Sequence, residues 1–314
     1  MCLLRGGVMK KIGRAEVEKA YEAIMKDCRP LEAARFAFLF LGDSAEAVVR
    51  ELEGLQNPDG GFGKALEPDF RYPGSSAIAT SFALGVIIET GLDREHRLVR
   101  DATRYLLDSF DNSQRTWYIV PPEIDAYPRA MWWDYSGWVK EDFTIIYPGN
   151  PGAELAGYFW HFDIRPGDFD LEVITREMID RLVRHEGIME VHELYCYFRM
   201  YEFVPGKFRN IMKEPLTKHT MELVSKEPAQ WNTYVPKPLD FVANKSSFLY
   251  PLLADVVEMN LDYLVDKMSS DGTWDPTWEW GRFPEEWEKA KLEWKGVETV
   301  KNLKILKAYD RLES

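Results

Sequence analysis

The chain has 314 residues and a formal net charge of −13, with 52 Asp and Glu residues against 39 Lys and Arg residues. This acidic balance opposes nonspecific binding to nucleic acid and to anionic lipid surfaces, because both are polyanions. Hydrophobic residues make up 46% of the chain and charged residues 29%, as in ordinary globular proteins, and no apolar run is long enough to span a bilayer. We therefore expect no nucleic-acid partner and no membrane span.

The three cysteines indicate neither a disulfide framework nor a cysteine-rich zinc site, since none belongs to a C-x-x-C pair. The N-terminal apolar stretch is too short for a secretory signal, so a cytoplasmic location is the default expectation. Residues 1–13 are expected to form a flexible extension, with Met9 a candidate for the biological start. Residues 14–314 are expected to form a single domain.

The most informative stretch is Gln56–Phe62, with the sequence Gln-Asn-Pro-Asp-Gly-Gly-Phe. Pro58 fixes its own φ, Asp59 can bond to the following backbone, and the two glycines accept positive φ, so this stretch predicts a sharp turn. A helix is expected to end just before it. Serines at positions 75 and 76 then precede an apolar run to Ile88 with helical spacing, which predicts a capped helix. The predicted unit is helix, glycine turn, aromatic residue, acidic loop and helix.

Helical spacing and helix-stop residues predict further helices on both sides of this unit. Before it, helices are expected over 14–26, over 31–41, and from a Ser44 cap to residue 53. After it, they are expected over 95–107, 151–162, 171–185, 191–203, 216–226, 247–257, 261–268 and 297–309. Two short extended pieces are expected, over 116–120 and 143–147. The stretch 118–150 is rich in aromatic residues and prolines, and it predicts a packed cover over one end of the domain.

The glycine turn recurs in weaker form along the chain. Asp271–Trp274, with the sequence Asp-Gly-Thr-Trp preceded by a serine, is the clearest copy, and Trp117 and Trp231 take the position of Phe62 in two others. The spacing gives about five two-helix repeats plus an N-terminal hairpin. Such repeats bury a face only against their neighbours and are typical of solenoids and closed toroids. The aromatic residues at this position are expected to plug the hairpin ends.

Gln56–Phe62 resembles the Q-x-x-D-G-G-F repeat of terpenoid cyclases and protein prenyltransferase β subunits, and it matches all seven positions. The resemblance covers residues 52–88 well, 264–309 moderately, and the region between only as a pattern. It implies an all-α fold, an α/α toroid of about five to six helical hairpins with few or no strands. In such a toroid, the loops that follow the turns meet at one end of a central cavity.

The catalytic motifs of these families are missing from the sequence. It contains no D-x-D-D, although Asp168–Leu171 reads D-F-D-L, and it contains no D-D-x-x-D and no D-x-C. His192 and Cys196 are one helical turn apart, which permits a metal site, but the surrounding aromatic residues favour a core helix. No phosphate loop, G-x-S-x-G or H-E-x-x-H occurs. Neither a metal nor a cofactor is expected, and whether the chain is an enzyme stays open.

Candidate site residues come from the acidic and aromatic loops after the turns. Carboxylates in a partly dry cavity can be driven to different pKa values and act as acid and base. Glu67, Asp69 and Asp240 are the expected catalytic acids, because neighbouring prolines stiffen their loops. The residues expected to bind the substrate are an aromatic wall and one acid: Trp132, Trp133, Trp278, Trp280 and Asp275. The alternative is that these are solvated loop acids and structural tryptophans.

Three functions are compatible with these features. The leading hypothesis is a protein of this repeat type whose acidic and aromatic cavity binds or transforms a neutral or hydrophobic organic molecule. One alternative is a carbohydrate-active enzyme, a glycosidase or lyase, that uses paired carboxylates. The other is a non-catalytic interaction scaffold. The sequence does not indicate the oligomeric state.

Overall fold

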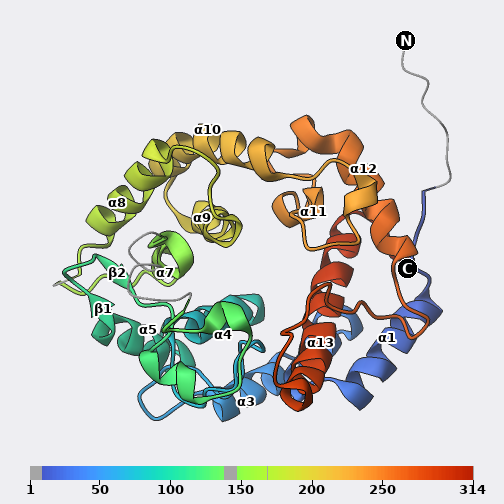
Figure 1. The fold of residues 1–314 in the computed structure, drawn as a ribbon, viewed down its shortest axis with the longest axis horizontal. Helices are drawn as coiled ribbons and strands as arrows, with labels where there is room; N and C mark the ends of the chain where they lie inside the picture. Colours follow the sequence, from blue (N-terminus) through green and yellow to red (C-terminus); the bar gives the residue numbers. More distant parts are fainter. Residues whose placement is uncertain (1–8, 138–146, 168, 314) are drawn as a thin grey trace. The chain divides into compact units, whose positions relative to one another are not determined.

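The computed structural model describes residues 9–137, 147–167 and 169–313, and they are mostly helical (Figure 1). Strands β1 (Phe110–Asp111) and β2 (Thr116–Trp117) pair antiparallel in a small hairpin. The all-α class is therefore confirmed. Within the described ranges, no helix is both long and apolar enough to cross a membrane.

Packing divides the chain into two compact units. Unit 1 comprises the described residues of Met1–Asp43, Val224–Trp278 and Leu292–Ser314. Unit 2 comprises Ser44–Leu223, apart from the undescribed residues 138–146 and 168, together with Glu279–Lys291. The expectation of one domain over 14–314 stays a prediction.

Unit 2 contains the helices of the central part of the chain. They are α3 (Glu46–Leu55), α4 (Ala77–Thr90), α5 (Arg97–Asp108), α7 (Gly149–His161), α8 (Leu171–Arg184), α9 (Val191–Phe203) and α10 (Gly206–Leu223). Two short 3-10 turns, η2 (Pro122–Ala126) and η3 (Met131–Trp133), lie between β2 and α7.

Helices α4, α7 and α9 form a row inside unit 2, in which α7 packs against both of the others (Figure 1). Helices α3 and α5 pack on α4, while α8 and α10 pack beside α7 and α9. The row helices run parallel, because their contacts advance in step along all three. The matched pairs are Ser81 with Glu154, Gly85 with Tyr158, Glu154 with Arg199, and Tyr158 with Phe203. The N-termini of the three helices therefore lie at the same end of the row.

Helix α4 is buried over most of its length because other helices cover it. Its N-cap is Ser76, whose hydroxyl accepts a hydrogen bond from the Ala79 N–H at 3.2 Å. Gly91 adopts the left-handed conformation that ends the helix. The predicted serine-capped helix is confirmed.

The glycine turn at 56–62 ties three helices of unit 2 together. Gly60 has φ +92°, and a Cβ on it would lie 2.3 Å from the carbonyl oxygen of Asp101 on α5. Phe62 is fully buried, and its N–H donates to Thr80 Oγ1 on α4 at 3.0 Å. The Gln56 side chain, at the end of α3, donates to the carbonyl of Gly60 and to a carbonyl on α5. The turn therefore fixes the positions of α3, α4 and α5.

Unit 1 is built from both ends of the chain and the segment after α10. Its elements are α1 (Arg14–Asp27), α2 (Pro30–Phe36), the π-helical η1 (Ala37–Leu41), η4 (Pro228–Gln230), α11 (Pro238–Phe241), α12 (Tyr250–Asp266) and α13 (Pro284–Ala308) from Leu292 onward. The two ends of the chain pair: the Ile12 N–H donates to the Arg311 carbonyl, and the Glu313 N–H donates to the Ile12 carbonyl.

The predicted second glycine turn, at Asp271–Trp274, is confirmed as a structural copy of the first. Gly272 has φ +84°, and a Cβ on it would lie 2.6 Å from the Glu16 carbonyl oxygen on α1. Three hydrogen bonds of the first turn have a counterpart in the second. The Ser269 N–H donates to the Thr273 carbonyl, as the Asn57 N–H does to Gly61, and the Gly272 N–H donates to the Ser269 carbonyl, as the Gly60 N–H does to Asn57. The Trp274 N–H donates to the Thr299 hydroxyl, as the Phe62 N–H does to Thr80.

The tryptophans in the aromatic position are structural plugs, as predicted. Each is buried, and each indole N–H donates to a backbone carbonyl: Trp117 to Leu106, Trp231 to Ser225, and Trp274 to Leu264.

Several predicted helix boundaries are wrong. The expected helix 216–226 begins ten residues earlier, since α10 keeps Pro215 inside it. The expected helices 247–257 and 261–268 are one continuous helix, α12, because no glycine or proline separates them. The last helix begins at Pro284 rather than 297. Ser44 does not cap α3, which starts at Glu46 without a side-chain cap. Of the expected strand 143–147, residues 143–146 lie outside the described residues. Residues 138–146 of the predicted cover over 118–150 also lie outside them.

The packing of the first glycine turn predicts that one methyl group added at Gly60 lowers the stability of the protein strongly. Gly60→Ala combines an unfavourable positive φ with a collision against the Asp101 carbonyl, so it should destabilise the protein by about 3 kcal/mol or more. Gly91→Ala is the matched control, because Gly91 also has positive φ, at +75°, but nothing lies within 4 Å of its Cβ position. It should cost about 1 to 2 kcal/mol. Urea unfolding followed by tryptophan fluorescence measures both losses, and equal losses would contradict the packing argument.

Candidate functional site

Five of the predicted site residues come together in unit 2. Asp69 is 5% exposed, and its two carboxylate oxygens accept hydrogen bonds from the indoles of Trp280 at 2.8 Å and Trp132 at 3.3 Å. The buried Glu67 accepts the Asp69 backbone N–H at 2.7 Å. Trp133 contacts Phe70, the residue after Asp69, and their rings meet edge to face at 5.4 Å. We name Glu67, Asp69, Trp132, Trp133 and Trp280 the acidic-aromatic cluster.

Two arginines fix the loops beside this cluster. Arg282 donates to both oxygens of Asp134, and Arg129 forms a second ion pair with the same carboxylate. Hydrogen bonds from Arg282 and the charge of Arg129 hold the pKa of Asp134 below its usual value. Arg282 also donates to the carbonyls of Arg129 and Ala130, so the 279–291 segment is bound to the 129–134 loop. These contacts hold the loops that carry Trp132, Trp133 and Trp280 in place around Asp69.

The remaining predicted residues lie in unit 1. Asp240 was expected in a proline-stiffened loop, but it lies on the short helix α11, where it accepts the Lys237 N–H at 2.8 Å and pairs with Lys301 at 3.4 Å. The helix forms because Pro238 is tolerated in a first helical turn. Asp275 pairs with Lys295 at 3.3 Å. These two acids are thus engaged in ion pairs.

Trp278 lies in an aromatic cluster of unit 1. Its ring meets those of Trp294 and Tyr234 edge to face, at 5.0 and 5.6 Å. Its indole nitrogen is buried, and no described residue forms a hydrogen bond with it. The expectation that Trp278 binds a substrate stays a prediction.

A pocket of about 400 Å³ lies at the N-terminal end of α4, in unit 2. We name it the tyrosine pocket. It is lined by Ser76, Ala77, Tyr105, Ser109, Tyr118, Val120, Pro121, Pro122 and Tyr135. The lining combines apolar surface with five hydroxyl-bearing side chains and includes no charged residue. Burial raises the pKa of Tyr105, which keeps its phenol protonated at physiological pH.

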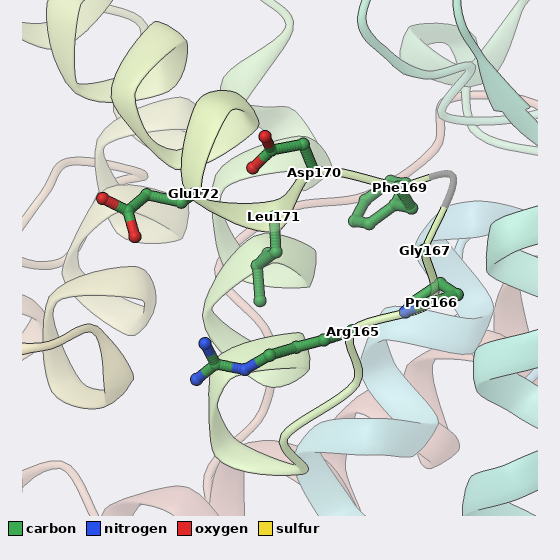
Figure 2. A pocket seen from close by; sticks show the side chains of 7 residues that line it. All are labelled: Arg165, Pro166, Gly167, Phe169, Asp170, Leu171 and Glu172. Atoms are coloured by element: carbon green, nitrogen blue, oxygen red, sulfur yellow. The ribbon is translucent and has the colours of Figure 1, made fainter.

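A second pocket, of about 330 Å³, surrounds the start of α8 (Figure 2). Figure 2 shows Arg165 apart from the acids Asp170 and Glu172, each with a local role. Arg165 pairs with Asp163 at 2.6 Å, Asp170 caps α8, and Glu172 binds two cations, one of them Lys207. This pocket therefore favours no particular ligand. Neither pocket includes a predicted site residue in its lining.

The sequence analysis missed a buried polar row across α4, α7 and α9. Glu154 on α7 is 3% exposed, accepts the Ser81 hydroxyl from α4 and forms an ion pair with Arg199 on α9. Its signal was available in the sequence, because Glu154 is a charged residue inside an otherwise apolar helical run. A buried carboxylate needs such partners to offset its desolvation.

Glu193 lies in the first turn of α9, beside His192, and was not among the predicted site residues. It is 1% exposed, accepts the Gly149 N–H at 3.0 Å and lies 3.5 Å from Arg181. Burial raises its pKa to about 7, although Gly149 and Arg181 oppose the shift. A carboxyl with a pKa near 7 can both give and take a proton at neutral pH.

The residues beside Glu193 have other partners. His192 lies 2.6 Å from Glu190, and Cys196 faces Asn150. No group of three or more potential metal ligands occurs in the part of the chain that the structure describes.

The chain has been compared with protein-family models, curated proteins and solved structures. None of the three gives a match. The resemblance to terpenoid cyclases and prenyltransferases therefore depends on the glycine-turn residues, and the toroid, ligand and activity that it implies are treated as proposals.

The indole contacts of Asp69 predict the effect of removing its charge. Asp69→Asn replaces one acceptor oxygen with an N–H₂ group that faces an indole N–H, so a buried donor loses its partner and stability should fall by about 1 to 3 kcal/mol. Asp108→Asn, at an exposed position of unit 2, should change stability by less than about 0.5 kcal/mol. Thermal unfolding compares the two variants. Equal effects would mean that the indoles do not hold Asp69.

The raised pKa of Glu193 predicts a pH-dependent gain from Glu193→Gln. Between the ordinary pKa of 4.5 and about 7, the folded protein keeps a proton that the unfolded chain loses, so the stability from this group is lost as pH rises through about 7. Relative to wild type, the variant should therefore gain about 3 kcal/mol between pH 4.5 and 8. Urea unfolding at several pH values measures the difference. A difference independent of pH would show that Glu193 has an ordinary pKa.

Proposed function

We propose that the chain is an α/α toroid of the terpenoid cyclase and prenyltransferase repeat type, and that unit 2 binds a neutral, largely apolar organic molecule. The observation that carries the ligand proposal is the tyrosine pocket, with its uncharged lining at the N-terminal end of α4.

The two glycine turns support the toroid. Gly60 packs against α5, the next helix outside the row, whereas Gly272 in the last repeat packs against α1, the first helix of the chain. In unit 1, α1 therefore takes the position that a following repeat would supply. The backbone bonds between Ile12 and the segment from Arg311 to Glu313 join the chain ends in the same unit. An open solenoid gives no reason for the last turn to pack on the first helix.

The tyrosine pocket supports the ligand class. Its volume of about 400 Å³ is in the range of small-molecule sites, which are mostly apolar with a few polar groups that orient the ligand. Because no lining residue is charged, an ionic ligand would lose its hydration without a counter-charge. Tyr105, Ser109, Tyr118 and Tyr135 belong to the lining, and their hydroxyl groups suit a ligand with one or two polar atoms.

A paired-carboxylate mechanism receives less support at this pocket. Glycosidases place two carboxyl groups on either side of the reacting bond. The tyrosine pocket has no carboxylate in its lining, and both oxygens of Asp69 already accept indole N–H groups. The carbohydrate enzyme and the scaffold are therefore kept as outcomes of the test.

Filling the pocket provides that test. Ser109→Trp places a large side chain at the exposed C-terminal end of α5, inside the pocket lining, and Ser44→Trp adds the same side chain at an exposed position outside it. Thermal-shift measurements compare prenyl alcohols, prenyl diphosphates and oligosaccharides. We expect prenyl alcohols to stabilise wild type and Ser44→Trp, by about 2.7 kcal/mol at 100 times Kd, and not Ser109→Trp.

The other outcomes separate the alternatives. Stabilisation by oligosaccharides alone would favour the carbohydrate enzyme, and no stabilisation by any of the three classes would favour the scaffold. Equal binding to wild type and Ser109→Trp would place the ligand outside the tyrosine pocket and overturn the proposal.

A further inference from the structure

Around Glu193, three buried polar atoms have no hydrogen-bond partner among the residues that the structure describes. They are Oε2 of Glu193, the hydroxyl of Tyr197, and Nε of Arg181. Glu193 and Tyr197 are 1% and 0% exposed. A buried polar group left unpaired costs about 1 to 3 kcal/mol, and most such groups in native proteins have a partner. Three at one place therefore require an explanation.

The side chains that carry these atoms lie close together. Glu193 and Tyr197 are one turn apart on α9, and a Cβ on Gly149 would lie 2.9 Å from Glu193 Oε1 and 3.0 Å from Tyr197 Cε2. Arg181, on α8, places Nε 3.5 Å from Glu193 Oε1, close enough for an ion pair but too long for a good hydrogen bond. The charges of Glu193 and Arg181 also act on the Tyr197 phenol, whose pKa burial raises far above its ordinary value.

A second buried carboxyl in the same row of helices is satisfied. Glu154, on α7, accepts the Ser81 hydroxyl from α4 at one oxygen and pairs through the other with Arg199 on α9. The row can therefore pair both oxygens of a buried carboxylate. At Glu193, one oxygen has no hydrogen-bond partner among the described residues.

We propose that Glu193, Tyr197 and Arg181 form a binding site for the hydroxyl or primary carboxamide group of a small neutral molecule. The guest must accept a hydrogen bond from Arg181 Nε–H and must also donate to, or accept from, the carboxyl and phenol groups. A neutral guest fits because burial already disfavours charge at Glu193, and a charged guest would lose its own hydration as well. The Arg181 side chain is 34% exposed and connects the site to solvent. This site shares no residue with the tyrosine pocket.

The experiment uses two amides of similar skeleton as probes. Acetamide both donates and accepts hydrogen bonds, whereas N,N-dimethylacetamide only accepts them. The readout is the ¹³C chemical shift of the Glu193 carboxyl in glutamate-labelled full-length protein, assigned with Glu193→Gln. Wild type should show a saturable shift with acetamide and none with dimethylacetamide.

Three variants test the assigned residues. Tyr197→Phe removes the hydroxyl, and Arg181→Lys keeps the charge but removes Nε–H, so each should weaken acetamide binding at least tenfold. Arg181 is partly exposed, so its variant should fold even if Tyr197→Phe does not. Tyr201→Phe, one turn further along α9, is the matched control and should bind as wild type does.

The result that would overturn the proposal is equally specific. If these groups hold no guest, Tyr197→Phe and Arg181→Lys would leave any acetamide shift unchanged. Ethanol serves as the hydroxyl probe. If neither acetamide nor ethanol causes a saturable shift, the site holds nothing larger than water and the proposal is wrong. An unchanged response in Ser109→Trp is expected, so failure of the tyrosine pocket and failure of this site can be told apart.

Discussion

The hydrogen bond from the Phe62 N–H to Thr80, at the end of a turn that brings backbone against backbone at Gly60, organises unit 2. A glycine is needed there because any Cβ would collide with the Asp101 carbonyl on α5. The same constraint recurs at Gly272, against α1. At each turn, the glycine lets the chain pack closely against a neighbouring helix and so fixes the position of that helix. The helix that follows Phe62 therefore begins at a defined place.

That placement explains why the chemistry gathers where it does. Since α4, α7 and α9 run parallel, the loops that precede them all reach the same end of the row. Most residues of the acidic-aromatic cluster and of the tyrosine pocket belong to the loops before α4 and α7, and Glu193 lies near the N-termini of α7 and α9. Trp280, from the segment 279–291, and Tyr105 and Ser109, from α5 and its end, complete them. Loops and helix starts carry backbone groups without helical partners, so they can hold polar side chains that a helix interior would exclude.

The sequence predicted local features well and long-range pairing poorly. Gln56–Phe62, its copy at Asp271–Trp274 and the helix 191–203 follow from turn chemistry and helical spacing, which act over a few residues. Asp69 was predicted as a catalytic acid in a stiff loop, and that role stays a prediction. Its indole partner Trp280 is 211 positions away, and no local pattern indicates that contact. The single helix α12 was divided in two because the expected repeat length was imposed on a run without a break.

Glu154 and Glu193 show where this fold departs from full internal pairing. Both are buried carboxyls on neighbouring parallel helices, and hydrogen bonding with an ion pair offsets the desolvation of Glu154. Glu193 receives one backbone N–H and a longer ion pair, and burial raises its pKa to about 7. A glutamine would keep the bond to Gly149 without the charge, so packing alone does not require an acid at this position. Local rules tend to be broken at functional sites, where stability is given up for binding or chemistry, and the N-terminal end of α9 is such a place.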